Sequence, residues 1–170
     1  MPDGEADASR LLWRVSNYIT LDGAGGLRAS ARWHTVGRRI VYLAESPAGA
    51  VFEAFVHLEV DPVAPPRHYR LLKVAVPPGV ALAAWESAVP GVSLDDLDTT
   101  REAGDRWLTR GTTALLRVPS AILPETYNVL LNPAHPDARL IQVAAHERYP
   151  WHPRWGATPA PLARADDDRT

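Results

Sequence analysis

Short runs of apolar residues, separated by glycine and proline, recur along most of the chain. Runs of about four to eight apolar or β-branched residues bounded by turn residues are typical of buried strands. The predicted strands are 11–18, 40–44, 69–76, 113–118, 127–131 and 140–144. With two helical segments, they predict a single α+β domain with a strongly bent, mainly antiparallel sheet.

One helix has a clear start. Ser46 is a favourable N-cap and Pro47 suits the first helical position, so we expect a helix from there to about Glu59. Apolar residues surround this segment almost completely, which predicts a central, buried helix. A second helix is predicted over 100–108, and 85–98 has the composition of an acidic loop.

Length and composition indicate one domain. The chain has 170 residues, 46% of them hydrophobic, which suits one ordinary core. We expect the globular domain to span 11–150. Charged, small and proline-rich sequences at 1–10 and 153–170 predict flexible tails.

Charge and cysteine content exclude several classes of function. The formal net charge of -2 argues against direct nucleic-acid binding, and the absence of cysteine excludes disulfides and thiolate chemistry. No apolar run approaches the roughly 18 residues of a membrane span. A soluble cytoplasmic protein is therefore expected.

Glu53 is the most informative single residue. It lies in the middle of the apolar helix, where an unpaired carboxylate would be costly, so it needs a partner or a chemical role. The alternative is a solvated polar stripe on an otherwise buried helix.

Two arginines are candidates for holding an anion. Arg32 follows a glycine-rich loop, where a guanidinium beside flexible backbone donors suits a diphosphate or a carboxylate. Arg14, inside the first predicted strand, must be paired if it points inward. The alternative for both residues is that they are ordinary surface arginines that bind no ligand.

The positions of Tyr42 and Ser120 in the sequence each allow two interpretations. Tyr42 is either a core aromatic residue or a flat surface for stacking a ligand ring. Ser120 follows Pro119 at a strand end, where its hydroxyl either faces a cleft or serves a turn. No Gly-x-Ser-x-Gly motif surrounds it, which argues against a serine hydrolase.

Metal and common nucleotide motifs are missing from the sequence. The six histidines show no metal-binding spacing, so no metal site is expected. There is also no Gly-x-Gly-x-x-Gly or Walker-type loop, which argues against Rossmann and P-loop nucleotide sites.

Several motifs occur in an order that resembles the RES-domain family. The first half carries Trp13-Arg14-Val15, Gly25-Gly26, Ala31-Arg32-Trp33-His34 and Phe52-Glu53. The second half carries Gly104-Asp105, Val118-Pro119-Ser120, Asn128 and Asn132-Pro133. The resemblance covers about Leu12 to Ile141. The arginine, glutamate and serine that name the family correspond to Arg32, Glu53 and Ser120.

The resemblance implies an ADP-ribosyltransferase-like fold and a substrate, NAD+. The implied protein is the toxin of a type II toxin–antitoxin system that cleaves the nicotinamide–ribose bond, by hydrolysis or phosphorolysis. Glu53 would stabilise the cationic ribose, Arg32 would grip the diphosphate or the ribose, and Ser120 would bind the ligand or steer Glu53. Further ligand contacts are expected at Tyr42, His34, Asn132 and Arg14.

Some alternatives remain open at this point. The same residues suit a protein mono-ADP-ribosyltransferase, and a catalytically inactive binding module within a repressor complex is the alternative of another class. The family pattern around the arginine is Gly-Arg-Trp-Asn, so His34 is a departure that bears on the nicotinamide end. The resemblance also implies a hetero-oligomer with an Xre-like antitoxin that covers the cleft and carries a DNA-binding helix-turn-helix.

Overall fold

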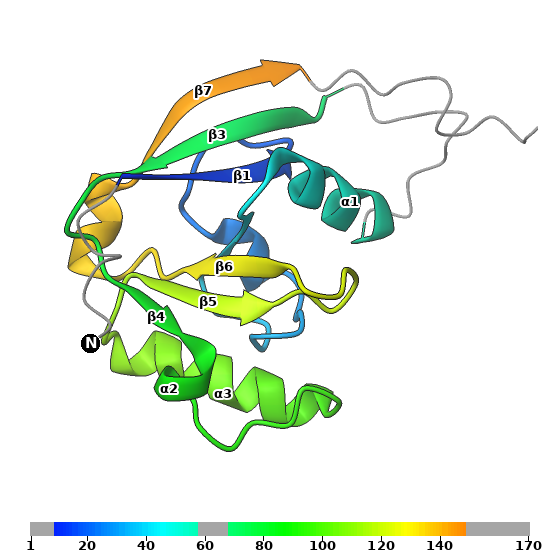
Figure 1. Cartoon of the computed structure of the whole chain (residues 1–170), viewed down its shortest axis with the longest axis vertical. Coiled ribbons are helices and arrows are strands. Elements are labelled where there is room, and N and C mark those ends of the chain that lie inside the picture. Colours follow the sequence, from blue (N-terminus) through cyan, green and yellow to red (C-terminus); the bar gives the residue numbers. More distant parts are fainter. Residues whose placement is uncertain (1–8, 58–67, 149–170) are drawn as a thin grey trace, which may run out of the picture.

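The computed structural model describes residues 9–57 and 68–148 (Figure 1). Its strands are β1 (Arg10–Ser16), β2 (Val41–Ala44), β3 (Arg70–Val76), β4 (Leu82–Ala84), β5 (Leu115–Pro119), β6 (Tyr127–Leu131) and β7 (Gln142–Arg148). Its helices are η1 (Ala24–Leu27), α1 (Pro47–His57), α2 (Trp85–Ala88), α3 (Leu97–Arg110) and η2 (Pro136–Leu140).

The strands form one seven-stranded sheet in the order β4-β5-β6-β2-β1-β3-β7. Every pairing is antiparallel except that of β4 with β5, so the prediction of a mainly antiparallel sheet is confirmed. β1 pairs with β3 along its whole length but with β2 only at Trp13↔Ala44. The sheet therefore has a narrow seam between β1 and β2, and Figure 1 shows β1, β3 and β7 diverging from β4, β5 and β6 on either side of it.

Side-chain alternation divides the core between the two faces of β2, β5 and β6. Val41, Leu115 and Val129 belong to a cluster that continues into β1 and β3. Leu116 and Leu130 point to the other face and belong to a second cluster that includes residues of α3. Tyr42 packs against this second cluster. The sheet face toward α3 is thus the face on which Tyr42 lies.

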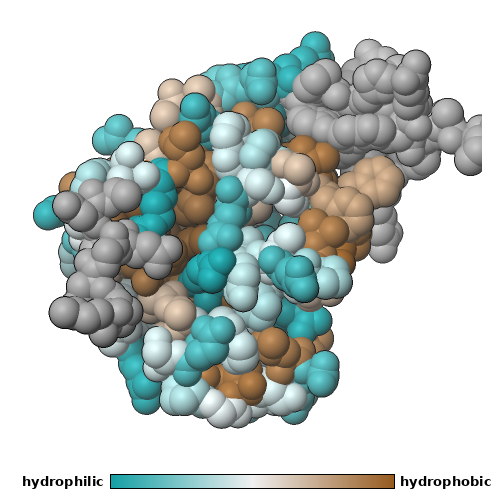
Figure 2. Space-filling model, in the orientation of Figure 1, coloured by the Kyte–Doolittle hydropathy of each residue, from teal (hydrophilic) through white to brown (hydrophobic). Residues whose placement is uncertain are grey.

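Helix α1 begins as predicted but is not a buried central helix. The Gly49 amide donates to Ser46 Oγ at 3.0 Å, which confirms the N-cap. However, Phe52 is 42% exposed and Val56 is 45% exposed, and Figure 2 shows hydrophobic side chains on the surface over this helix. The prediction of a central, buried helix was wrong, because α1 packs one side against the sheet and leaves an apolar side in solvent.

The other differences from the predicted elements are local. The predicted acidic loop 85–98 begins with the short helix α2, and the second predicted helix is longer, as α3. β4 was missed because three residues carry too little pattern, and the last strand begins later because η2 includes Leu140. Arg10, assigned to a tail, begins β1; the rest of both predicted tails lies outside the described residues except Ser9. None of the described helices has the length and apolar character to cross a bilayer.

Candidate active site

A pocket of about 370 Å³ opens at the seam between β1 and β2. Trp13, Ala44 and Asn128 share one face of the sheet through the pairings of β1 with β2 and of β2 with β6, and all three line the pocket. Glu53 lines it from α1, and Arg32 lines it from the loop before β2. The separation of the two halves of the sheet creates the space that a ligand needs.

Glu53 holds a fixed orientation on the wall of this pocket. Its Oε1 accepts hydrogen bonds from Ser120 Oγ at 2.7 Å and from Asn128 Nδ2 at 2.6 Å. These lengths are typical of strong hydrogen bonds to an ionised acceptor. Of the two readings of Glu53, the structure therefore favours a positioned carboxylate over a solvated stripe.

Ser120 directs its hydroxyl proton toward Glu53. The backbone amides of Ile122 and Leu123 donate to Ser120 Oγ at 3.2 Å and 3.1 Å. Because these two donors meet the lone pairs of the oxygen, its own proton is left for the carboxylate. Ser120 is not among the residues that line the main pocket, so its position suits steering Glu53 better than direct contact with a ligand there.

Arg32 brings positive charge to the pocket, and it has no acidic partner in the part of the chain that the structure describes. Within the described residues, its only hydrogen bond runs from a terminal nitrogen to the Leu94 carbonyl oxygen at 2.8 Å. That bond orients the guanidinium, and no carboxylate within 9–57 and 68–148 forms an ion pair with it. The remaining donors suit an anionic or hydroxyl-rich ligand.

Arg14 also lines the pocket, and it is more buried than a typical arginine. Burial lowers the pKa of its guanidinium, and the negative charge of Asp22 opposes that shift. In the part of the chain that the structure describes, no hydrogen bond or ion pair holds the guanidinium. A partly buried cation without such a bond is costly, and an anionic ligand would reduce the cost.

Tyr42 lines the pocket while its hydroxyl joins a chain of hydrogen bonds behind it. The Trp33 amide donates to Tyr42 Oη at 3.1 Å, and Oη lies 2.9 Å from His34 Nδ1. His34 Nε2 lies 3.0 Å from the Ala29 carbonyl oxygen, which can only accept. The imidazole proton therefore resides on Nε2, and Tyr42 donates to Nδ1.

His34 is 3% exposed and does not line the pocket. Burial lowers its pKa, which maintains the neutral ring that this hydrogen-bond chain requires. Burial also raises the pKa of Tyr42 strongly, so its hydroxyl keeps its proton. The departure from the family pattern at this position thus acts behind the pocket wall, where it orients Tyr42.

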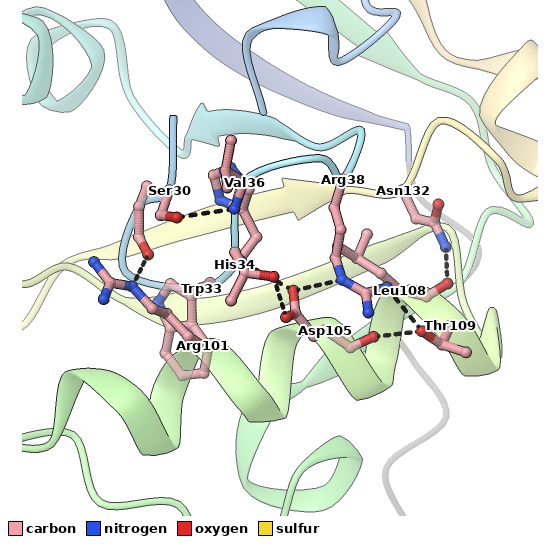
Figure 3. A network of polar contacts seen from close by, with 12 residues as sticks. Ser30, Trp33, His34, Val36, Arg38, Arg101, Asp105, Leu108, Thr109 and Asn132 are labelled. Carbon is pink, nitrogen blue, oxygen red and sulfur yellow. Dashed lines mark hydrogen bonds and ion pairs between the residues drawn. The ribbon is translucent and has the colours of Figure 1, made fainter. Parts of the chain in front are cut away.

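Helix α3 anchors the loop that carries Arg32 (Figure 3). Asp105 Oδ1 and Oδ2 accept from the Thr35 amide at 3.1 Å and the Thr35 hydroxyl at 2.7 Å, and Arg38 Nε lies 3.1 Å from Oδ1. Arg101 Nε donates to the Ala31 carbonyl oxygen at 3.0 Å. These bonds bracket Arg32 on both sides and keep it at the pocket.

Asn132 lies outside the pocket lining, and its side chain is used within the fold. Its Nδ2 donates to the Leu108 carbonyl oxygen at 3.1 Å, as Figure 3 shows, and its Oδ1 accepts from the Ala134 amide at 3.1 Å. These bonds connect the turn after β6 to the end of α3. Of the expected ligand contacts, Tyr42, Arg14 and Arg32 line the pocket together with Glu53, whereas His34, Ser120 and Asn132 do not.

Local sequence patterns do not predict the site roles of Asn128, Asp105 or Arg101. Asn128 does carry a usable signal, because it is the one amide in β6, whose other residues are apolar or aromatic. Asp105 and Arg101 act across about 70 residues of sequence, so only the fold brings them to the loop. Among the described residues, no group of acidic or histidine side chains has the arrangement to hold a metal ion.

Comparisons with known proteins agree with this architecture. A chain of the MbcT–MbcA toxin–antitoxin complex of M. tuberculosis superimposes with a TM-score of 0.67 at 16% identity, over 89% of this chain and 88% of that one. At this identity, the comparison shows the fold alone. The α+β fold predicted from the sequence is therefore confirmed.

Closer relatives are found by sequence. Toxin Res of Pseudomonas putida is 45% identical over 140 residues, covering 82% of this chain and 96% of the relative. The Prs ADP-ribosylating toxin of a Sphingobium strain is 41% identical over 154 residues, covering 84% of this chain and 94% of the relative. The RES domain model matches residues 11–152. The chain therefore belongs to the RES-domain family of toxins.

Proposed function

We propose that this protein binds NAD+ in the main pocket and breaks the bond between nicotinamide and ribose, acting as the toxin of a toxin–antitoxin pair in the cytoplasm. One observation carries the proposal: the Glu53 carboxylate is held by Ser120 and Asn128 on the wall of a pocket that Arg32 also lines. A fixed anion and a cation that has no acidic partner among the described residues line the same pocket, and this combination suits a ligand with a developing positive charge and a diphosphate.

The leaving group needs no help from an acidic residue of the enzyme. The electron pair of the broken bond returns to the nicotinamide ring nitrogen, so nicotinamide departs neutral without a general acid. The ribose meanwhile gains oxocarbenium character, as in glycoside cleavage. Glu53 stabilises that positive charge, and its two hydrogen bonds keep the carboxylate in place during the reaction.

The cations and the aromatic residues bind the rest of the substrate. Arg32 and Arg14 supply hydrogen-bond donors for the diphosphate. The negative charge of the diphosphate also offsets the cost of removing the Arg14 cation from water. The ring of Tyr42, oriented from behind by His34, offers a stacking surface for nicotinamide. Asn128 and Ser120 act through Glu53.

The bond-breaking residues leave the acceptor open between water, phosphate and a protein side chain. The Sphingobium relative is an ADP-ribosylating toxin by name, which keeps transfer to a protein as the second candidate. All three reactions share the first step. They differ only in the nucleophile that reaches the ribose, which depends on access to Glu53.

Replacement of one carboxylate tests the proposed function. Glu53→Gln keeps the size of the side chain and removes its charge, so NAD+ consumption is expected to fall by at least about a hundredfold with the melting temperature nearly unchanged. The matched control is Glu102→Gln, an exposed carboxylate on α3 that is outside the pocket and should retain full turnover. Normal turnover by a folded Glu53→Gln protein, or none by the wild type, would refute the proposal.

An antitoxin partner belongs to the same proposal. A structural neighbour comes from a toxin–antitoxin complex, and Phe52 and Val56 present apolar surface on the outer side of the helix that carries Glu53. We expect an Xre-like antitoxin with a helix-turn-helix to cover the pocket and supply DNA binding. Co-expression with the neighbouring gene should yield a complex that no longer consumes NAD+; an active complex would contradict the covering role.

A further inference from the structure

A second, smaller pocket adjoins the main one at the catalytic carboxylate. It has a volume of about 200 Å³ and shares Ala44, Glu53 and Asn128 with the main pocket. Glu53 therefore stands between two spaces. If NAD+ occupies the larger space with its ribose at Glu53, the smaller one is a separate route by which a nucleophile can reach the same carboxylate.

Among the residues that the structure describes, the charged side chains that line this second pocket are all acidic. Glu45, Glu53 and Glu125 line it, and within 9–57 and 68–148 no lysine, arginine or histidine does. Glu125 has φ of 59°, a left-handed conformation that is unusual for a residue other than glycine. It lies at the far end of the loop that begins with Ser120, and the Ser120 amide closes this loop by donating to the Thr126 carbonyl oxygen at 2.9 Å.

Arg117, which contacts two residues of this lining, is already engaged. Arg117 Nε donates to Glu45 Oε1 at 2.6 Å, and its second terminal nitrogen donates to Oε2 at 3.3 Å. Its guanidinium carbon also lies 3.4 Å from the ring centroid of Tyr127, which lines the pocket. The Arg117 guanidinium thus already binds a carboxylate and stacks on an aromatic ring, so it does not offer a pair of donors to an incoming anion.

We propose, on the basis of the proposed NAD+ cleavage, that the acceptor enters through this second pocket and that Glu45 and Glu125 select against anionic nucleophiles, so that the acceptor is uncharged or cationic. Inorganic phosphate would have to approach the carboxylates of Glu53 and Glu125, together with that of Glu45, whose charge the ion pair with Arg117 partly offsets. Water, a hydroxyl group or an amine meets no such barrier. The acidic lining thus favours hydrolysis and transfer to a side chain over phosphorolysis. The residues that break the bond do not themselves discriminate between these acceptors.

The transfer step is balanced for each acceptor. The bond from ribose C1 to nicotinamide breaks with its electron pair on the ring nitrogen, and a lone pair of the acceptor forms the new bond to C1. Water or an alcohol gives its proton to Glu53, and the proton then passes to solvent. A cationic amine or guanidinium first loses one proton to solvent, which supplies the lone pair, and gives a second proton to Glu53 as the new bond to C1 forms. Water yields ADP-ribose, an amine yields an N-linked ADP-ribose, and phosphate would yield ADP-ribose 1-phosphate.

Product ratios provide the test. Wild-type protein is incubated with NAD+ and either inorganic phosphate, the cationic amine agmatine or chloride at equal ionic strength, and the products are separated by mass spectrometry. We expect ADP-ribose to predominate over the phosphate product, and agmatine to be modified more readily than phosphate at equal concentration. Predominance of ADP-ribose 1-phosphate would overturn the proposal.

Charge variants make the test specific. Glu45→Gln removes a charge and releases Arg117, and Glu125→Gln removes a charge at the other end of the pocket; each is expected to raise the ratio of phosphate product to ADP-ribose by about fivefold. Glu86→Gln, on α2 and outside both pockets, is the matched control and should leave the ratio unchanged. The ratio is independent of the fraction of active protein, so partial misfolding does not obscure it.

The two proposals fail in different ways. Absence of NAD+ consumption by wild-type protein would reject the proposed function, and the acceptor route with it. Normal consumption with an unchanged product ratio in both Glu45→Gln and Glu125→Gln would reject the acceptor route alone.

Discussion

Tyr42 donates its hydroxyl proton to Nδ1 of His34 across 2.9 Å, and the opposite nitrogen of the same imidazole is anchored on the Ala29 carbonyl oxygen at 3.0 Å. The ring centroids of the two residues are 5.7 Å apart. His34 therefore fixes the ring that forms one wall of the pocket without touching the pocket itself. A histidine does this better than asparagine, because its two nitrogens reach opposite partners.

Variants of His34 should act on NAD+ binding through Tyr42. His34→Asn retains an acceptor for the Tyr42 hydroxyl but loses the donor to Ala29, and His34→Ala loses both. We expect KM for NAD+ to rise by about threefold in the former and about tenfold in the latter, with kcat changed much less. Steady-state kinetics measure the two parameters separately.

A double-mutant cycle distinguishes positioning from a general packing defect. If His34 acts through the Tyr42 hydroxyl, the effects of His34→Ala and Tyr42→Phe on NAD+ binding should overlap, with a coupling energy of about 1 kcal/mol. Strictly additive effects would show that the hydrogen bond between them does not orient the ring.

The pH dependence of stability follows from the same histidine. Burial lowers the folded-state pKa of His34 below its ordinary value of 6.5, while Asp105 opposes and Arg101 assists that shift. Below about pH 6.5 the unfolded state binds a proton that the folded state does not, so stability should fall as the pH drops toward the folded-state pKa and then level off. Urea unfolding at about pH 7.5 and about pH 5.5 measures this loss.

His34→Asn provides the reference for that measurement. This variant lacks the titrating imidazole, so the loss of unfolding free energy between about pH 7.5 and about pH 5.5 should be smaller than in the wild type. An identical loss of stability in the variant and the wild type would assign the dependence to other groups.

Asn128 tests how the orientation of Glu53 is maintained. Asn128→Ala removes the 2.6 Å hydrogen bond to Oε1, and we expect turnover to fall by about tenfold. Asn128→Asp places a second carboxylate against Glu53, so one of the two must take up a proton or move away, and the loss should reach about a hundredfold at neutral pH. Higher activity in the Asp variant than in the Ala variant would contradict this electrostatic role.

Local sequence patterns were sufficient for the elements that carry the site. The strands that became β2 and β6 and the N-cap of α1 were visible because apolar runs and capping residues act over a few positions. The solvent-exposed side of α1 was not visible, since an apolar residue has the same appearance in sequence whether a sheet covers it or not. Burial is decided by the packing of distant segments.

The candidate site shows the same limit. Glu53 was recognisable as a carboxylate in an apolar helix, and Arg32 as a guanidinium beside a glycine-rich loop. The pocket that both residues line opens beside the single register pair Trp13↔Ala44, and no local pattern encodes that pairing. The anchoring of the Arg32 loop by Asp105 also depends on the position of α3, because the partners are 70 residues apart in sequence.

The close approach of α3 to this loop makes Gly104 sensitive to the smallest substitution. An alanine Cβ at this position would lie 1.9 Å from the Trp33 carbonyl oxygen and 2.8 Å from its carbonyl carbon. Gly→Ala in a helix ordinarily stabilises by about 1 kcal/mol. Here the clash is with backbone, which cannot rotate away, so we expect Gly104→Ala to destabilise the protein by about 2–4 kcal/mol.

The same substitution should also weaken NAD+ binding, because Trp33 follows Arg32 directly and any shift of α3 moves both. Thermal unfolding and KM for NAD+ report the two effects. Gly25→Ala is the matched control, since its Cβ meets no atom within 4 Å, and it should change neither quantity. If Gly104→Ala raised the melting temperature instead, the contact between α3 and the Arg32 loop would have to be looser than the structure shows, and the loop would need another anchor.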